Sequence, residues 1–410
     1  MTRVIGPADK GMPPEAHGRS VADFVAGSPR LTDLWTPLLV LDGAAIGDNI
    51  AFVADWVAGH GLELMPHGKT TMAPQLWQRQ LHAGATGITL ATPWQLGVAV
   101  DAGIRSIMLA NQLTDPAAIH WLGCGGAGDA RVWSWMDDAD AVAWTERALD
   151  GHATHPLEIL VELGRPGGRT GARTLDEAVQ IAEIVAASPS LRLAGVAGYE
   201  GAVAHGRGLD AIDTARRYVD DLVALHGRLR DLYADGDVIV TAGGSAYPDV
   251  VTDSFTAAAA VDSARFVLRS GAYVTHDEGY YRAVSPFERH GLRAAARGVA
   301  RVVSHPEPGL VLVDAGKRDF PFDEGLPIPL FAVARDGERI SLQGAETVKL
   351  NDQHAFVRFD DDRGVRLGDL IVFGLSHPCT MFDKWRLIPV VDTLDDLARA
   401  TVVDLVETRF

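Results

Sequence analysis

A histidine and a cysteine lie two residues apart near the end of this 410-residue chain, in the segment His377-Pro378-Cys379. An imidazole and a thiolate are both good ligands for a transition-metal ion such as zinc. The pair follows the apolar run at residues 369–375, which predicts a β-strand, and residues i and i+2 of a strand point to the same face. Two protein ligands leave coordination positions open, which is typical of a catalytic rather than a structural metal site.

The same tripeptide is also compatible with a turn that contains a buried thiol, because an unpaired cysteine often packs as a small apolar residue. The spacing alone leaves both interpretations open. Cys124, the other cysteine, lies in a glycine-rich loop with no basic neighbour and no partner, and we interpret it as inert. Two cysteines give no disulfide framework, which indicates a reducing, cytoplasmic environment.

A lysine is the second feature that points to chemistry, because Lys69 follows a β-like run at residues 62–67 with only one glycine between them. A partly desolvated amine at such a position can form a Schiff base with an aldehyde cofactor. Most lysines are solvated surface residues. This chain contains only five lysines, however, and a lysine beside a strand end is therefore a candidate for a specific role.

The central part of the chain alternates short β-like runs with helix-like stretches, which is the pattern of βα units. Thr174 and Glu177 form the S/T-x-x-E pattern of a capping box at the start of one of these helices. The repeated units predict a (β/α)8 TIM-type barrel, with a doubly wound sheet as the alternative. The eight runs are at residues 62–67, 87–92, 106–111, 131–136, 157–163, 193–200, 238–242 and 266–270.

Functional groups of a barrel collect where its strands end, and several polar residues of this chain follow the predicted strands. Glycine-rich loops are common, so each is a weak signal by itself. Gly243-Gly244-Ser245 offers backbone N–H groups and a hydroxyl to a phosphate. An arginine after the fifth strand could reach the phenolate oxygen of a pyridoxal ring. The candidates are Lys69, Arg169, Tyr199, His205, Gly243, Gly244, Ser245 and Tyr273.

Beyond about residue 285 the helical periodicity disappears and short alternating runs predict a smaller β domain. The run at residues 38–42 precedes the barrel and is expected to join this domain. The predicted organisation is therefore an N-terminal tail and strand at 1–46, a cofactor-binding barrel at 47–284 and a metal-binding β domain at 285–410. The expected β-domain strands are at residues 298–304, 309–314, 329–333, 346–350, 355–359 and 369–375.

The formal net charge of −17 argues against nucleic acid and anionic membrane surfaces as partners. The N-terminal segment is polar and rich in proline and glycine, unlike a signal peptide. No apolar stretch has the length of a membrane span. These features favour a cytoplasmic protein with a small-molecule substrate.

Taken together, the motifs PHGKT, GRTG, GYEG, GGS, RSGAY and HPC resemble the D-serine dehydratase-like and D-threonine aldolase family. This family belongs to the alanine-racemase-like, fold type III pyridoxal phosphate enzymes. The resemblance extends from about residue 37 to residue 386, with the motifs in the family's order. It implies a barrel that binds pyridoxal phosphate, a β domain that binds a divalent metal, and a homodimer.

The resemblance also implies a role for each matching residue. Lys69 would carry the cofactor as a Schiff base, Arg169 would contact the cofactor phenolate, and Tyr199 would lie beside the cofactor. Gly243, Gly244 and Ser245 would bind the phosphate, with Tyr273 close by. His377 and Cys379 would bind zinc or manganese, and His205 would lie near the substrate hydroxyl. Two departures are the segment around His354, which only approximates the family's acidic-acidic-His-Gly pattern, and the TTM that follows Lys69.

The implied activity is that of a lyase acting on D-β-hydroxy amino acids. A D-serine dehydratase, acting on D-serine, D-threonine or D-3-hydroxyaspartate, would release a 2-oxo acid and ammonia, and the cysteine beside the histidine favours this branch. A D-threonine aldolase would instead release glycine and an aldehyde. An amino-acid racemase and a pyridoxal phosphate carrier are more distant alternatives. A racemase has no use for His377 and Cys379, and the additional β domain argues against a carrier, because such carriers resemble the barrel alone.

Overall fold

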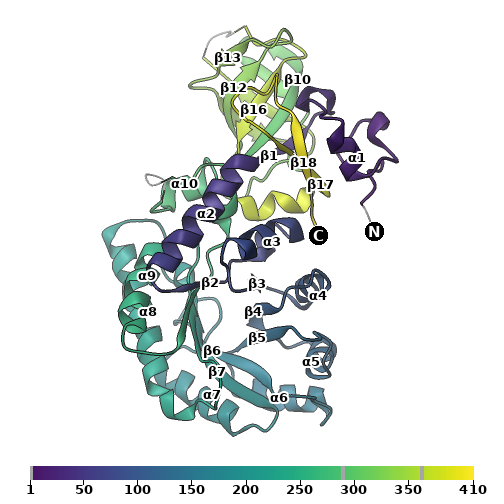
Figure 1. The fold of residues 1–410 in the computed structure, drawn as a ribbon. Helices are drawn as coiled ribbons and strands as arrows, with labels where there is room; N and C mark the ends of the chain where they lie inside the picture. The colour runs from purple at the N-terminus through teal and green to yellow at the C-terminus, as the bar shows by residue number, and fades with distance from the viewer. Residues whose placement is uncertain (1–2, 288–290, 361–363) are drawn as a thin grey trace. The chain divides into compact units, whose positions relative to one another are not determined.

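The computed structural model describes residues 3–287, 291–360 and 364–410 (Figure 1). The chain divides into two compact units. The barrel unit consists of Val53–Lys69 and Trp77–Gly271, and the β unit of Met1–Phe52, Thr70–Leu76 and Ala272–Phe410. Neither unit is continuous in sequence, and the predicted division at residues 46 and 284 stays a prediction.

Eight parallel strands form the sheet of the barrel unit, in the order β2-β9-β8-β7-β6-β5-β4-β3. The two edges of this sheet meet, because His67 and Thr89 form a parallel bridge and the N–H of Thr89 donates to the carbonyl oxygen of Pro66 at 2.9 Å. The barrel is therefore confirmed and the doubly wound sheet is excluded. The strands are β2 Glu63–Leu64, β3 Ile88–Leu90, β4 Ser106–Gln112, β5 Arg131–Met136, β6 Leu157–Leu163, β7 Leu191–Gly198, β8 Ile239–Ala242 and β9 Arg265–Leu268.

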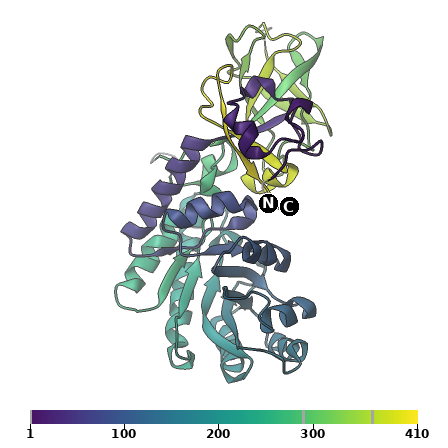
Figure 2. The same ribbon diagram turned by 45° about the vertical axis from the view of Figure 1, so that its right-hand side comes forward.

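The helices between these strands lie on the outside of the barrel (Figure 2). Thr174 caps α7 as predicted, since its hydroxyl accepts the N–H of Glu177 at 3.1 Å. The carboxylate of Glu177 returns to the N–H of Arg173 rather than to that of Thr174. The helices are α4 Pro93–Asp101, α5 Pro116–Gly123, α6 Asp140–Leu149, α7 Leu175–Ala187, α8 Leu209–Arg228 and α9 Pro248–Ala259, while α2 Gly43–Gly59 and α3 Pro74–His82 each cross a unit boundary.

Buried apolar side chains from the strands fill the interior of the barrel. Strand β6 is buried along almost its whole length, as expected for a parallel strand covered on both faces. The central cluster contains Met65, Met108, Trp133, Trp135, Leu160, Ala194, Ala197, Ile239 and Val267.

The β unit contains a ten-stranded, largely antiparallel sheet in which the main path runs β13-β12-β16-β10-β1-β17-β18. Strand β1 pairs antiparallel with β10 and parallel with β17, so the run at residues 38–42 does join this sheet. The six predicted runs all form strands, whereas β13, β17 and β18 match no predicted run. The bounds are β1 Leu38–Asp42, β10 Ala296–Glu307, β11 Leu310–Val313, β12 Ile328–Val333, β13 Arg339–Ser341, β14 Glu346–Leu350, β15 Ala355–Arg358, β16 Leu370–Gly374, β17 Leu387–Val391 and β18 Val402–Glu407.

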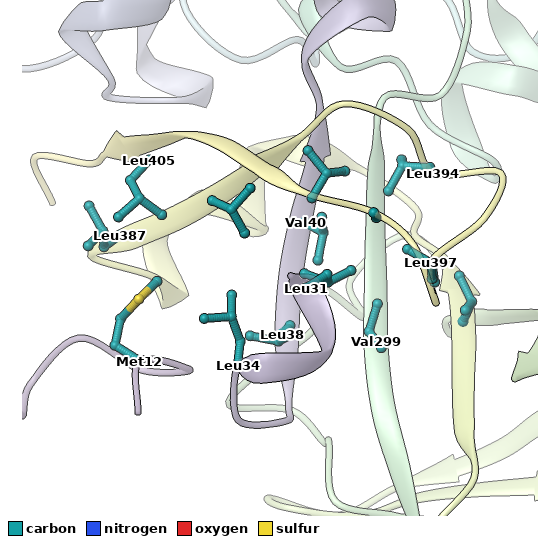
Figure 3. Packing of buried hydrophobic residues seen from close by; sticks show 14 of the residues in the cluster. Met12, Leu31, Leu34, Leu38, Val40, Val299, Leu387, Leu394, Leu397 and Leu405 are labelled. Atoms are coloured by element: carbon teal, nitrogen blue, oxygen red, sulfur yellow. The ribbon is translucent and has the colours of Figure 1, made fainter. Parts of the chain in front are cut away.

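The N-terminal segment packs against this sheet and completes its core (Figure 3). Met12, Leu31 and Leu34 contribute buried side chains beside Leu387 and Leu405 of the last two strands. Helices α1 Val21–Ala26 and α10 Tyr280–Val284 also belong to the β unit. Within the described residues, the structure has no helix with the length and apolar character needed to cross a membrane.

Candidate functional site

Lys69 lies in a 3-10 turn, Gly68–Thr70, that follows the bridge closing the barrel. The indole of Trp77 fixes this turn, because its Nε1–H donates to the carbonyl oxygen of Gly68 at 3.1 Å. Residue 68 must be glycine here, since a Cβ would lie 2.7 Å from the indole nitrogen. The Lys69 side chain is therefore attached to a rigid point at the end of the first barrel strand, where it is half-buried.

His67 lies close to three positively charged side chains, Lys69, Arg269 and Arg169. Burial lowers the pKa of His67 well below its usual value, and the three cations lower it further. The imidazole is therefore neutral, and its buried Nδ1 has no hydrogen-bond partner among the described residues. Three cationic side chains around a histidine nitrogen that lacks a hydrogen-bond partner fit an anionic cofactor with hydrogen-bonding groups, such as pyridoxal phosphate.

Arg269 is a residue of this site that the sequence interpretation missed, although it begins the RSGAY motif. Its guanidinium is buried and donates to the Thr241 hydroxyl at 2.7 Å and to the carbonyl oxygen of Gly198 at 2.6 Å. Its buried Nε has no partner among the described residues. Burial lowers the pKa of Arg269, and Glu200 and Glu162 act in the opposite direction. One donor of a buried cation is thus left for a ligand.

The glycine loop after β8 is occupied by a carboxylate from its own chain. Glu200 is fully buried and accepts the N–H groups of Gly243 at 3.0 Å and of Gly244 at 2.7 Å. Burial raises the pKa of Glu200, while these hydrogen bonds lower it. The expectation that both N–H groups are free for a phosphate is therefore wrong for this conformation, because the sequence does not show which side chain folds onto the loop.

Arg169 and Tyr199 lie together at the mouth of the barrel, as their positions after β6 and β7 predict. The guanidinium carbon of Arg169 is 5.1 Å from the centre of the Tyr199 ring. The same ring packs against Gly244, where a Cβ would lie 2.6 Å from a ring carbon. The carboxylate of Glu162 accepts the hydroxyl of Thr170 and so holds the loop that carries Arg169. Burial raises the pKa of this carboxyl group. The barrel unit thus brings together the residues assigned to the cofactor ring and the loop assigned to its phosphate.

His377 and Cys379 of the β unit do meet, but not in the way that a strand would bring them together. Strand β16 ends at Gly374, and His377 has a left-handed backbone with φ +60° before the 3-10 turn Pro378–Thr380. The expectation that both residues project from one strand face is therefore wrong. Hydrogen bonding to Cys379 raises the pKa of His377 to about 9, with Asp323 adding to the effect and burial opposing it.

Three further residues of the β unit surround this pair. The Thr70 hydroxyl lies 3.3 Å from the sulfur of Cys379, and Thr70 is the residue that follows Lys69 in the chain. Asp323 contacts the Nδ1 of His377, and Asp277 accepts the N–H of His377 at 2.9 Å. No group of three or more His, Cys, Asp or Glu side chains is arranged to hold a metal among the described residues. A thiol and an imidazole with hydrogen-bonded neighbours still fit a two-ligand site.

The remaining predicted residues lie elsewhere. Tyr273 is buried in the turn Ala272–Val274 of the β unit. His205 is exposed in the loop before α8, and His354 is exposed in the turn between β14 and β15. Cys124 does have a basic neighbour, since its sulfur lies 3.6 Å from Nε2 of His120, one helical turn earlier. The thiol also lies 3.5 Å from the carbonyl oxygen of His152, so the expectation that Cys124 has no basic neighbour and no partner is wrong.

Comparison with known proteins agrees with the motifs. Residues 295–391 match the model of the putative serine dehydratase domain. The chain is 28% identical over 369 residues to a 3-hydroxy-D-aspartate aldolase from Paracoccus denitrificans (strain Pd 1222), which covers 86% of this chain and 88% of the relative. The crystal structure of D-threonine aldolase from Filomicrobium marinum is 26% identical, with a TM-score of 0.77 over 92% of this chain and 95% of that chain.

A more distant structure shares the fold. An alanine racemase-like protein from Idiomarina loihiensis is 16% identical, with a TM-score of 0.71 over 91% of this chain and 96% of that chain. The resemblance of this chain to the D-serine dehydratase-like and D-threonine aldolase family is confirmed, and so is its alanine-racemase-like fold.

Proposed function

We propose, from the confirmed resemblance to the D-serine dehydratase-like and D-threonine aldolase family, that this chain is a pyridoxal phosphate- and divalent metal-dependent lyase for D-β-hydroxy amino acids. The observation that carries the proposal is the turn that presents the His377 imidazole and the Cys379 thiol, in which Thr70 lies 3.3 Å from the sulfur and Asp323 lies 2.6 Å from Nδ1 of the histidine. A racemase or a cofactor carrier has no use for a soft metal-binding pair. Zinc and manganese are the ions we expect there.

In the barrel unit, Lys69 would attach the cofactor, while Arg169 and Tyr199 would contact its ring. When bound, pyridoxal phosphate supplies an electron sink for the Cα of the amino acid. The phosphate would rely on Ser245 and on neighbouring donors, because Glu200 occupies the N–H groups of Gly243 and Gly244. Tyr273 of the RSGAY motif is a further candidate for the phosphate.

The two lyase reactions require a base at different atoms. A dehydratase must remove the Cα proton, and the Lys69 amine is the candidate base. An aldolase must remove the proton of the β-hydroxyl, for which His205 is the candidate. In either reaction, an ion bound by His377 and Cys379 would supply Lewis acidity for the β-hydroxyl oxygen.

We place dehydration first, to give a 2-oxo acid and ammonia, with D-serine as the principal substrate. The match to the putative serine dehydratase domain includes both His377 and Cys379, which supports this choice. Aldol cleavage to glycine and an aldehyde is the second candidate, favoured by the similarity to a 3-hydroxy-D-aspartate aldolase and to a D-threonine aldolase. The predicted homodimer and cytoplasmic location stay predictions.

The products distinguish these reactions. Purified protein, supplied with pyridoxal phosphate and Zn²⁺ or Mn²⁺, should be incubated separately with D-serine, D-threonine and D-threo-3-hydroxyaspartate. Equal amounts of 2-oxo acid and ammonia identify a dehydratase, whereas equal amounts of glycine and aldehyde identify an aldolase. The variant Lys69→Ala should form neither set of products. Release of only the L-enantiomer of the substrate would contradict the lyase proposal.

A further inference from the structure

We propose that Asp323 is a positioning residue for the metal site, because it binds the Nδ1 of His377 and leaves Nε2 as the nitrogen that ligates the metal. This inference rests on the proposed metal site at His377 and Cys379. Neither the sequence motifs nor the comparisons assign a role to Asp323, which lies in the loop before β12.

The contacts of Asp323 define its orientation. Its Oδ2 lies 2.6 Å from Nδ1 of His377, and its Oδ1 accepts the hydroxyl of Thr380 at 2.6 Å. Each carboxylate oxygen therefore has a partner in the segment that carries the two proposed ligands. A carboxylate held in this way accepts the Nδ1–H of the ring, so that Nδ1 keeps its proton and Nε2 is the nitrogen that a metal ion would bind.

The backbone of His377 is fixed independently. The Oδ2 of Asp277 accepts its N–H at 2.9 Å, and the Oδ1 of the same carboxylate accepts the N–H groups of Gly279 and Tyr281 at 2.9 Å each. Asp277 is buried, so these bonds are protected from water. They hold residue 377 in its left-handed conformation, which is uncommon for a residue with a side chain.

The imidazole ring is also confined from the side. The ring centres of Tyr280 and Tyr281 lie 6.2 Å and 6.3 Å from that of His377. With Nδ1 bound to Asp323, the hydrogen bond to Cys379 falls to Nε2, and a metal ion held by both residues would take the place of that hydrogen bond. Ligating histidines commonly donate their second N–H to a carboxylate, and loss of that partner typically weakens metal binding by 10–100-fold.

The test measures metal affinity rather than turnover. Full-length wild-type protein and the variant Asp323→Asn should be titrated with Zn²⁺ against a chromogenic chelator. We expect the variant to bind about 10–100-fold more weakly, and Asp323→Glu to recover part of the loss. Asp383→Asn is the matched control, because Asp383 is similarly exposed, at 43% against 40%, and pairs only with Lys384 among the printed ion pairs of the described residues. Its affinity should equal that of the wild type.

Co²⁺ substitution separates positioning from direct ligation. If Asp323 only orients His377, the Co²⁺ spectrum of Asp323→Asn should keep the thiolate charge-transfer band and the d–d pattern of the wild type. Unchanged Zn²⁺ affinity, or a d–d pattern showing the loss of a ligand, would overturn the inference. If wild-type affinity survives the double change His377→Ala and Cys379→Ala, the proposed metal site itself is wrong, and Asp323 has no ligand to position. Thermal unfolding of each variant should show that it is folded.

Discussion

The carboxylate of Glu200 lies 2.7 Å from the backbone nitrogen of Gly244, in a fully buried position. The same carboxylate accepts the N–H of Gly243, so one side chain satisfies two amides of the loop after β8. A second anion cannot use those amides unless the carboxylate moves. Glu200 therefore determines both the shape of the glycine loop and the donors left for a phosphate.

Replacing Glu200 by Ala should leave two buried amides without acceptors. An unsatisfied buried donor costs about 1–3 kcal/mol, so the free energy of unfolding of the barrel unit should fall by at least that amount in urea titrations. Glu200→Gln keeps one acceptor and should be milder. Glu183, an exposed glutamate of α7, is the control site, and Glu183→Ala should have little effect. Equal stability of both alanine variants would contradict the role of Glu200.

Lys69 should be the residue that carries the cofactor. Protein purified with pyridoxal phosphate should absorb visible light, and borohydride reduction should attach the cofactor to the peptide containing Lys69, as identified by mass spectrometry. Lys69→Ala should abolish the attachment and lower turnover by several orders of magnitude. Lys349→Ala, on a strand of the β unit, is the control. A label on Lys317 or Lys349 would show that the assignment is wrong.

Metal removal should inactivate the enzyme without unfolding it, because water and substrate complete the coordination of a two-ligand site. Turnover should return with Zn²⁺ or Mn²⁺, while the visible band of the cofactor persists throughout. Cys379→Ala and His377→Ala should each weaken metal binding and reduce turnover, and the cofactor should remain attached. Full activity in excess chelator would contradict the metal dependence.

The enzyme should act on D-β-hydroxy amino acids and not on the L forms. This expectation rests on the resemblance to the D-serine dehydratase-like and D-threonine aldolase family. Product formation from D-serine and L-serine, measured under identical conditions, tests this expectation. Similar rates with D-serine and L-serine would contradict the substrate class that the family resemblance implies.

The barrel unit should become less stable as the pH falls below neutrality. Burial lowers the pKa of His226, although Asp262, 3.1 Å from its Nε2, acts in the opposite direction. The unfolded chain takes up a proton near the ordinary histidine pKa of about 6.5, while the folded histidine stays neutral. The unfolded state therefore binds more protons below that pH, and the free energy of unfolding declines toward pH 5. His67 adds to the decline for the same reason.

Urea titrations between pH 7 and pH 5 measure this dependence. His226→Gln should lower stability overall, because it removes the contacts with Asp262 and Tyr233, but it should flatten the pH dependence. His82→Gln, at an exposed position of α3, should leave the slope unchanged. An unaltered slope in His226→Gln would show that another group is responsible.

The sequence by itself determined the order of elements and the motifs at their ends. Short apolar runs identify the strands of the barrel, because a buried strand needs consecutive apolar residues and this requirement is visible in the sequence itself. The position of Lys69, just after the first of these runs, could therefore be predicted. The assignment of His377 and Cys379 to a metal site stays a prediction, and the strand geometry from which the sequence argued it is wrong. The pattern of the apolar run does not show that β16 ends at Gly374 or that His377 turns to φ +60°.

Only the tertiary structure showed which side chains hold His377 and the glycine loop in place. Asp277 and Asp323 contact His377 from 100 and 54 residues away, and Glu200 reaches Gly243 across 43 residues. Contacts of this kind depend on how strands and loops pack, and a periodic pattern contains no information about them. Hydrogen bonds to buried groups are nonetheless costly to lose, so these distant carboxylates fix the geometry of the glycine loop and of the histidine–cysteine turn.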